Sequence, residues 1–155
     1  MYEDVAQSAL VNTRWRFATN QFALNRLTDA PTGRYDYAYQ LPSDVIDVRT
    51  ILVGDTVVDY EVFGDQVFLN AGVTDTVTAI YTFRAPENTW APWFRLYVEL
   101  TLASMFAGAV AMKGDLAKIY ESKAKEQGAK ARKRDSQRQT ARKVKTTRFI
   151  SNRRG

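Results

Sequence analysis

The sequence contains 155 residues with a formal net charge of +5, and it has neither cysteine nor histidine. A chain of this length can form one domain with a hydrophobic core plus an appendage, but it is short for two domains. The two missing residue types exclude cysteine nucleophiles, thiolate zinc sites and catalysis by an imidazole acid or base.

The charge is divided unevenly along the chain. Residues 1–112 contain seven arginines, no lysine and thirteen acidic residues, so that this part has a net charge of −6. Residues 113–155 contain fifteen lysines or arginines and four acidic residues, so that their net charge is +11. Such asymmetry indicates an anionic partner for the basic half: nucleic acid, an anionic surface or an acidic protein.

The first residues are acidic and lack an apolar core, so we expect no signal peptide. The most apolar run, from Leu100 to Met112, has about a dozen residues, whereas a bilayer needs about twenty. We therefore expect no membrane anchor, and a soluble protein made and used in a cytoplasm.

The first predicted element is a helix over residues 2–12. Acidic residues lie in its first turn, where the helix dipole favours them. The apolar stripe of this helix contains Val5, Ala6, Ala9 and Leu10. The apolar residues of the next stretch, 15–27, fit both the alternation of a strand and the spacing of a helix, and we favour a strand.

After a turn at residues 29–33, the region 35–84 predicts β-structure. Val77, Ala79, Tyr81 and Phe83 alternate with polar residues and should share one face of a strand. Short turns between the segments favour an antiparallel meander. The expected strands cover residues 35–39, 48–53, 57–63, 66–70 and 76–84, with turns at Gly54-Asp55 and Gly64-Asp65.

A helix is expected over residues 89–113. From Leu96 to Met112 it is apolar nearly all round, which predicts burial on several sides. Glu99 lies within this apolar stretch, so we expect a partner for its charge: Arg95 at i−4, or a group of a neighbouring subunit. Arg95 and Glu99 are therefore candidate intersubunit residues.

Gly114 is expected to be the C-terminal cap of this helix, and Asp115 the N-cap of the next helix. That second helix can pack through Leu116, Ile119 and Tyr120, but residues 121–143 are polar on every face. A helix without a packing stripe is marginal in water. We therefore expect residues 121–143 to project or fray in the free protein, and residues 145–155 to be ordered only with a partner.

Three interpretations of the basic segment remain open. It can be a solvated tail, a non-specific contact to nucleic acid phosphates, or a segment that docks into another protein. Phe149 and Ile150 form a small apolar anchor among the cations. The anchor favours protein docking, because a phosphate contact needs no apolar pair.

Catalytic chemistry has little support in the sequence. Asp44 with Asp47, or Asp59 with Glu61, could be paired as carboxylates, but solvated charges explain them more simply. A phosphate-binding glycine loop, a serine nucleophile motif and a metal-ligand cluster are all missing from the sequence. We therefore expect a protein that is not an enzyme and has no cofactor, metal or catalytic residues.

Three segments carry a resemblance to a known family. They are the W-x-F-A-T pattern of residues 15–19, the Y-x-L-P-x-D pattern of residues 39–44, and a looser Y…W-x-P-W-F pattern over residues 81–94. With the order of the predicted elements, the sequence resembles the tail tubular protein A family, the head-to-tail adaptors of short-tailed bacteriophages. The resemblance covers about residues 2–145.

The resemblance implies an α+β fold: a helical bundle core, an inserted antiparallel β-meander and an extended basic C-terminal helix or arm. It divides the chain into an adaptor body, 1–120, with the β region 35–84 and the buried helix 89–113, and an arm, 121–155, that orders on binding a partner. Members of the family usually carry a further helix ahead of the segment that begins here at Tyr2. The resemblance then implies that this chain is a short form of the family, or that its start lies downstream of the usual start of family members.

The resemblance also implies a homo-oligomeric ring, usually of twelve copies, that joins the portal protein to the tail nozzle protein. Double-stranded DNA passes through the ring, and the acidic body would repel it. The protein would be located in the virion tail at the portal vertex, and in the host cytoplasm during assembly. Gly54, Asp55, Gly64 and Asp65 are candidate nozzle contacts. The candidate portal-binding residues of the arm are Arg132, Lys133, Arg134, Arg138, Arg142, Lys143, Lys145, Arg148, Phe149, Ile150, Arg153 and Arg154.

The alternative function belongs to a different class. A small non-specific nucleic-acid-binding protein could use the same arm to coat DNA or RNA. That alternative predicts monomers or dimers and salt-sensitive binding to any duplex. The adaptor interpretation predicts assembly with a portal and weak binding of DNA by the body.

Overall fold

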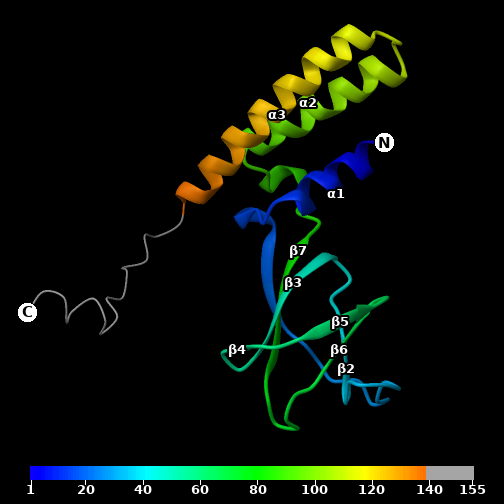
Figure 1. Ribbon diagram of the computed structural model, residues 1–155. Coiled ribbons are helices and arrows are strands. Elements are labelled where there is room, and N and C mark those ends of the chain that lie inside the picture. Colours follow the sequence, from blue (N-terminus) through cyan, green and yellow to red (C-terminus); the bar gives the residue numbers. More distant parts are fainter. Residues whose placement is uncertain (139–155) are drawn as a thin grey trace, which may run out of the picture.

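The computed structural model of the chain describes residues 1–138 (Figure 1). An N-terminal helix is followed by two small antiparallel sheets and then by two packed helices, so the predicted α+β class is confirmed. The elements are α1 (Tyr2–Asn12), the 3-10 turn η1 (Arg16–Ala18), β1 (Thr19–Ala23), β2 (Tyr37–Gln40), β3 (Val45–Val53), β4 (Thr56–Val57), β5 (Tyr60–Phe63), β6 (Gln66–Leu69), β7 (Val77–Phe83), the 3-10 turn η2 (Glu87–Thr89), α2 (Pro92–Ala109) and α3 (Gly114–Gln137).

The β region is not a single meander, so that prediction was wrong. One sheet has the strand order β1-β7-β3-β4 and the other has the order β2-β6-β5, with antiparallel pairing throughout. The expected strand over residues 57–63 is divided, because the chain leaves the first sheet after Val57 and enters the second at Tyr60. The Tyr60 hydroxyl donates to the carbonyl of Val48 at 3.1 Å and so ties β5 to β3.

The two sheets share a hydrophobic core. Alternation along β7 places Val77, Ala79 and Tyr81 on the inner face, as the sequence predicted. Ile51 from β3 and Val67 from β6 are fully buried against them. The segment favoured as a strand over residues 15–27 forms one only over Thr19–Ala23, after the turn η1.

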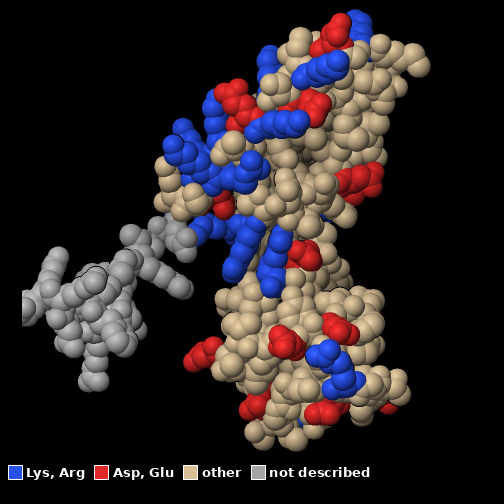
Figure 2. Space-filling view, viewed as in Figure 1, with Lys and Arg blue, Asp and Glu red and all other residues tan. Residues whose placement is uncertain are grey.

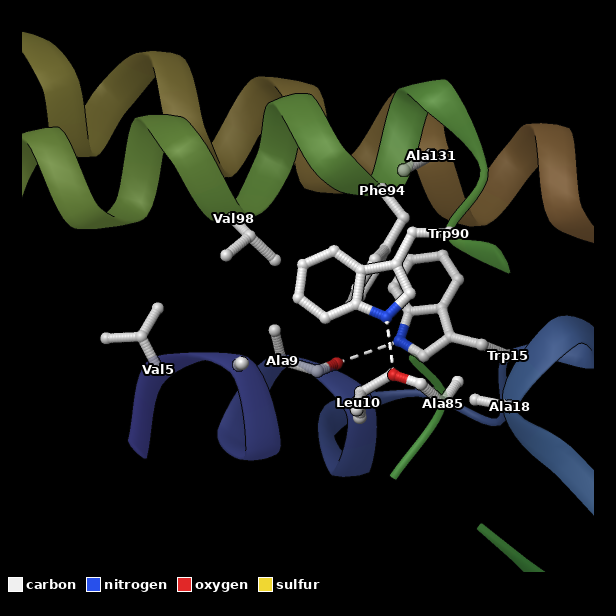
Figure 3. Close-up of a cluster of buried hydrophobic side chains, with 11 residues drawn as sticks. Val5, Ala9, Leu10, Trp15, Ala18, Ala85, Trp90, Phe94, Val98 and Ala131 are labelled. Atoms are coloured by element: carbon white, nitrogen blue, oxygen red, sulfur yellow. Dashed lines mark hydrogen bonds between the residues drawn. The ribbon is translucent and has the colours of Figure 1, made fainter. Parts of the chain in front are cut away.

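A second core lies between α1, α2 and the segment that follows α1 (Figure 3). The indole of Trp15 is fully buried, and its Nε1 donates to the carbonyl of Ala9 at 2.8 Å. The indole of Trp90 donates to the carbonyl of Ala85 at 2.9 Å. Both indoles contact Phe94 edge-to-face with ring centroids 5.0 Å apart, a favoured aromatic geometry. Their polar atoms are therefore satisfied inside an apolar core.

The helix α1 is confirmed over residues 2–12, and its buried stripe is the predicted one. Two arginines hold the ends of α1. Arg49 from β3 donates to the carbonyl of Val11 at 2.6 Å, where the helix dipole favours a cation. Arg84 donates to both carboxylate oxygens of Glu3, at 2.7 and 3.0 Å. The helix is therefore fixed to the β region at both ends.

The helix α2 is shorter than the predicted 89–113. Pro92 begins it, since proline suits the first helical position, and η2 occupies residues 87–89. The prediction of burial on several sides was wrong for the single chain, because only Phe94, Val98 and Ala107 of α2 are buried. Gly114 does not cap α2 but begins α3, and Met112 adopts the left-handed conformation, with φ 51°.

The helix α3 packs along α2 as an antiparallel hairpin (Figure 1). The expectation that residues beyond Tyr120 have no packing face was wrong for the described part of the chain. Ala124, Gly128 and Ala131 are buried, and Asp135 is only 4% exposed. A Cβ added at Gly128 would lie 2.9 Å from the Tyr97 ring, so the two helices approach closely there. Small residues thus provide the contact that large apolar side chains usually provide.

Candidate functional site

The far end of the α2–α3 hairpin exposes a cluster of large apolar side chains. Figure 1 shows that this end points away from the sheets. Phe106 is 50% exposed, Val110 66% and Met112 88%. Met112 also adopts a left-handed backbone conformation that costs a residue with a Cβ about 1 kcal/mol. We define the hairpin tip as the exposed apolar residues of this end: Met105, Phe106, Val110, Met112, Leu116 and Ile119.

The two helices are joined near the tip. Ser104 donates its hydroxyl to the carbonyl of Ala117 at 3.0 Å across the two helices. A Cβ added at Gly108 would lie 3.5 Å from the Cβ of Ala117, so α2 and α3 run close together there. Several large exposed apolar side chains at one end of a helical hairpin are typical of a protein-interaction site.

Arg95 and Glu99 are both exposed on α2, and they form no ion pair within residues 1–138. Arg95 instead donates to the carbonyl of Glu87 at 3.3 Å. The predicted i,i+4 pair is therefore wrong in the single chain. The alternative, a partner for Glu99 on a neighbouring subunit, stays a prediction.

The two candidate nozzle turns lie in different places. Gly54 has φ 60° and Gly64 has φ 61°, which explains why glycine occupies each turn. The carbonyl of Asp65 accepts from the Leu41 backbone N–H at 2.9 Å, whereas Gly54 donates to the carbonyl of Thr76 at 3.0 Å. The fold does not bring the two turns together, since Gly54 and Gly64 line separate surface hollows.

The C-terminal part of α3 is strongly basic. On the face that Figure 2 shows, Lys and Arg side chains gather over this part of α3 and over the narrow region between the helices and the sheets, which we call the waist. Arg132, Lys133, Arg134 and Arg138 are all exposed. Arg138 lies over the ring of Trp93, 4.8 Å from its centroid. The other candidate residues of the arm lie outside the described residues: Arg142, Lys143, Lys145, Arg148, Phe149, Ile150, Arg153 and Arg154.

The structure adds two cations that the sequence analysis placed in the acidic body. Arg14 and Arg16, in the connection from α1 to β1, line a cleft of about 810 Å³ with Arg132 from α3. The backbone N–H of Arg16 donates to Oδ2 of Asp135 at 3.2 Å, which fixes this connection against α3. A charge count along the chain could not detect the arrangement, because tertiary packing brings the two segments together.

An ion network lies at the other end of α1. The guanidinium of Arg84 bonds to Glu3 and to Glu87, and the hydroxyl of Tyr2 donates to Glu87 at 2.9 Å. Hydrogen bonds from Arg84 and then Gln7 lower the pKa of Glu3 from 4.5 to about 2. Both carboxylates are more than half exposed, at 51% and 52%, so the network positions α1 rather than forming a catalytic site.

Two kinds of site are absent from residues 1–138. In the part of the chain that the structure describes, no cluster of three or more His, Cys, Asp or Glu could hold a metal ion. Within residues 1–138, no helix has both the length and the apolar character required to span a membrane. Within residues 1–138, large apolar side chains are exposed at the hairpin tip and also in the β region, for example Phe63 and Val73, and cations gather at the basic end of α3.

No known protein-family model matches this chain, and a search of curated proteins finds no match either.

Proposed function

We propose that this chain is a structural head-to-tail adaptor of a short-tailed bacteriophage, whose copies form a ring between the portal and the tail nozzle. The observation that carries the proposal is the apolar hairpin tip, which is ordered, exposed and far from the β region. The order of elements supports the proposal: the β region is inserted between α1 and the α2–α3 hairpin, as expected for a helical core with a β insertion.

The tip supports assembly more than catalysis. Burying the exposed parts of Phe106, Val110 and Met112 against a neighbour would stabilise a contact by about 25 cal/mol for each Å² of apolar surface removed from water. A ring forms when the tip packs against a different surface of the neighbouring copy and the rotation between copies closes on itself. A ring, usually of twelve copies in the resembling family, would continue the channel through which the DNA leaves.

The basic end of α3 is proposed to bind the portal together with the chain that follows. Exposed arginines on α3 can pair with carboxylates of a partner in a bidentate geometry. In the sequence, Phe149 and Ile150 follow as a candidate apolar anchor. We propose that residues 139–155, which lie outside the described residues, contact the portal together with the basic end of α3.

The test mixes the purified protein with a portal complex and measures the mass and stoichiometry of the product. The proposal predicts a closed ring on the portal, and loss of binding when residues 139–155 are deleted. A double variant of the tip, Phe106→Ser/Val110→Ser, should bind the portal without closing the ring. The proposal would be contradicted if the deletion of residues 139–155 and the double variant of the tip both left ring formation unchanged.

The second candidate is a non-specific nucleic-acid-binding protein, and the clustering of cations at the waist favours it (Figure 2). This candidate predicts a monomer or dimer that binds any duplex with steep salt dependence. If the protein does not bind the portal but binds DNA tightly through residues 121–155, the adaptor proposal is wrong and the nucleic-acid-binding function is supported instead.

A further inference from the structure

The cleft at the waist joins segments from opposite ends of the described chain. Arg14 and Arg16 come from the α1–β1 connection, and Arg132 from α3. The 3.2 Å hydrogen bond from the Arg16 backbone N–H to Asp135 holds these segments at a fixed distance. The nine residues that line the cleft are Thr13, Arg14, Arg16, Thr19, Asn20, Gln21, Arg132, Asp135 and Ser136.

Three exposed arginines contribute to the cleft. Arg14, Arg16 and Arg132 form no ion pair within residues 1–138. The guanidinium of Arg132 lies back along α3 near Gly128 and also lines the adjoining hollow there, so it reaches the cleft from one side. The acid of the lining, Asp135, is 4% exposed and accepts a backbone N–H. It therefore belongs to the floor of the cleft, and the rim has a surplus of positive charge.

Among the neutral lining side chains, two hydroxyls are already engaged within the protein. The hydroxyl of Thr19 donates to the carbonyl of Trp15 at 2.6 Å, and that of Ser136 donates to the carbonyl of Lys133 at 2.8 Å. Because a hydroxyl has a single proton to donate, neither is a donor for a ligand in this arrangement. The exposed side-chain amide of Gln21 lines the same cleft, and arginine and glutamine side chains are common donors to phosphate oxygens.

The composition of the lining discriminates between possible ligands. Guanidinium groups bind carboxylates and phosphates alike, so the positive charge of the cleft does not show which of these two groups it binds. A docking site for a protein usually includes aromatic or aliphatic residues at its centre. All of the described residues that line this cleft are polar or charged, and protein–DNA interfaces are characteristically polar and positive. The cleft therefore fits phosphate groups better than an acidic protein segment.

We infer that this cleft is a binding site for the phosphodiester backbone of duplex DNA. Single strands are usually held by aromatic side chains that stack on the bases, and among residues 1–138 no aromatic residue lines the cleft. The contact is made to phosphates and is independent of base sequence. A polar cleft open to solvent at the waist can approach a duplex without insertion into a groove.

This inference does not depend on the proposed adaptor function. A ring subunit can contact DNA at its waist, and so can a free monomer. The binding of DNA is measured on the protein alone, and the adaptor function is measured with a portal complex. A negative portal assay does not decide the DNA-binding result, and a negative DNA-binding assay does not decide the portal result, although Arg132 is assigned to both contacts.

The experiment uses the full chain and a short fluorescent duplex of random sequence. Binding is followed by fluorescence anisotropy over a series of salt concentrations for wild type and for the triple variant Arg14→Gln/Arg16→Gln/Arg132→Gln. The matched control, Lys113→Gln/Lys118→Gln/Lys123→Gln, removes the same charge from exposed positions toward the hairpin tip. Residues 139–155 are present in all three proteins, so their contribution cancels. Circular dichroism establishes that each variant folds.

The cleft variant should flatten the slope of log K against log salt concentration by about 2 to 3, since each phosphate contact contributes about 0.9. The control should change the slope by less than about 1. Equal effects of the two variants would overturn the inference. It would also be overturned if the cleft variant lost binding to a fluorescent polyglutamate peptide but kept its binding to the duplex, since the cleft would then be a docking site for an acidic protein.

Discussion

The two ends of the α2–α3 hairpin differ in what covers their apolar side chains. At the end near the sheets, Phe94 is fully buried between the indoles of Trp15 and Trp90. At the tip, Phe106 on the same helix is half exposed. One helix thus contributes to the fold at one end and presents an open apolar surface at the other. An apolar sequence alone does not tell these two roles apart.

The largest expected effect comes from truncating a phenylalanine at each end. Phe94→Ala should lower the free energy of unfolding by about 3–5 kcal/mol, because it leaves a cavity in a packed aromatic core. Phe106→Ala is the matched control and should cost less than about 1 kcal/mol, because its ring is already half in water. Urea denaturation followed by circular dichroism measures both values. Equal losses would contradict the comparison.

The second prediction concerns two glycines in the hairpin. Gly128→Ala should give a protein less stable than Gly108→Ala by about 1–3 kcal/mol, since the new Cβ lies 2.9 Å from the Tyr97 ring and forces a shift. At Gly108 the nearest atom is 3.5 Å from the added Cβ, an ordinary contact. Both substitutions gain the same helix propensity, so it cancels in the comparison. Equal unfolding midpoints would show that the close approach of α3 to Tyr97 is absent.

The third prediction separates stability from assembly at the tip. Phe106→Ser/Val110→Ser should change the free energy of unfolding by less than about 1 kcal/mol, because both side chains are at least half exposed. Self-association on a portal complex should nevertheless be lost. Analytical ultracentrifugation and thermal denaturation measure the two properties. A large loss of stability would show that the tip is part of the fold.

The smallest expected effect is a dependence of stability on pH. The pKa of Glu3 is about 2 in the folded protein and 4.5 ordinarily, because Arg84 binds its carboxylate. Its contribution to stability is therefore present above about pH 4.5 and is lost as the pH falls toward 2. The difference in melting temperature between wild type and Glu3→Gln should shrink over this range. A difference independent of pH would mean that the bond to Arg84 does not form in solution.

Local patterns predicted the parts of the fold that depend on one element. The stripe of α1 and the inner face of β7 follow from periods of 3.6 and 2 residues, and both were found where expected. The pairing of strands depends on contacts between distant segments, for example β1 with β7. A series of short strands therefore did not reveal that the chain divides them between two sheets.

The packing of α3 was missed because its contact residues are small. Ala124, Gly128 and Ala131 give little hydrophobic signal, yet they allow α2 to approach closely. Arg14 and Arg16 were missed as members of the basic surface for a different reason. They belong to an acidic stretch of sequence, and the hydrogen bond to Asp135 brings that stretch to α3. The basic surface is therefore a property of the fold and not of one segment.

The exposure of a single engineered thiol tests the central claim about the tip most directly. The chain has no cysteine, so Met112→Cys introduces one thiol at a position that is 88% exposed. Val73→Cys, 77% exposed in the β region, is the control. When a portal complex is added, maleimide labelling should slow more than about tenfold at position 112, since an interface excludes the reagent from a buried thiol. It should remain unchanged at position 73. Unchanged labelling at position 112 in an assembled complex would contradict the assignment of the tip as the interface.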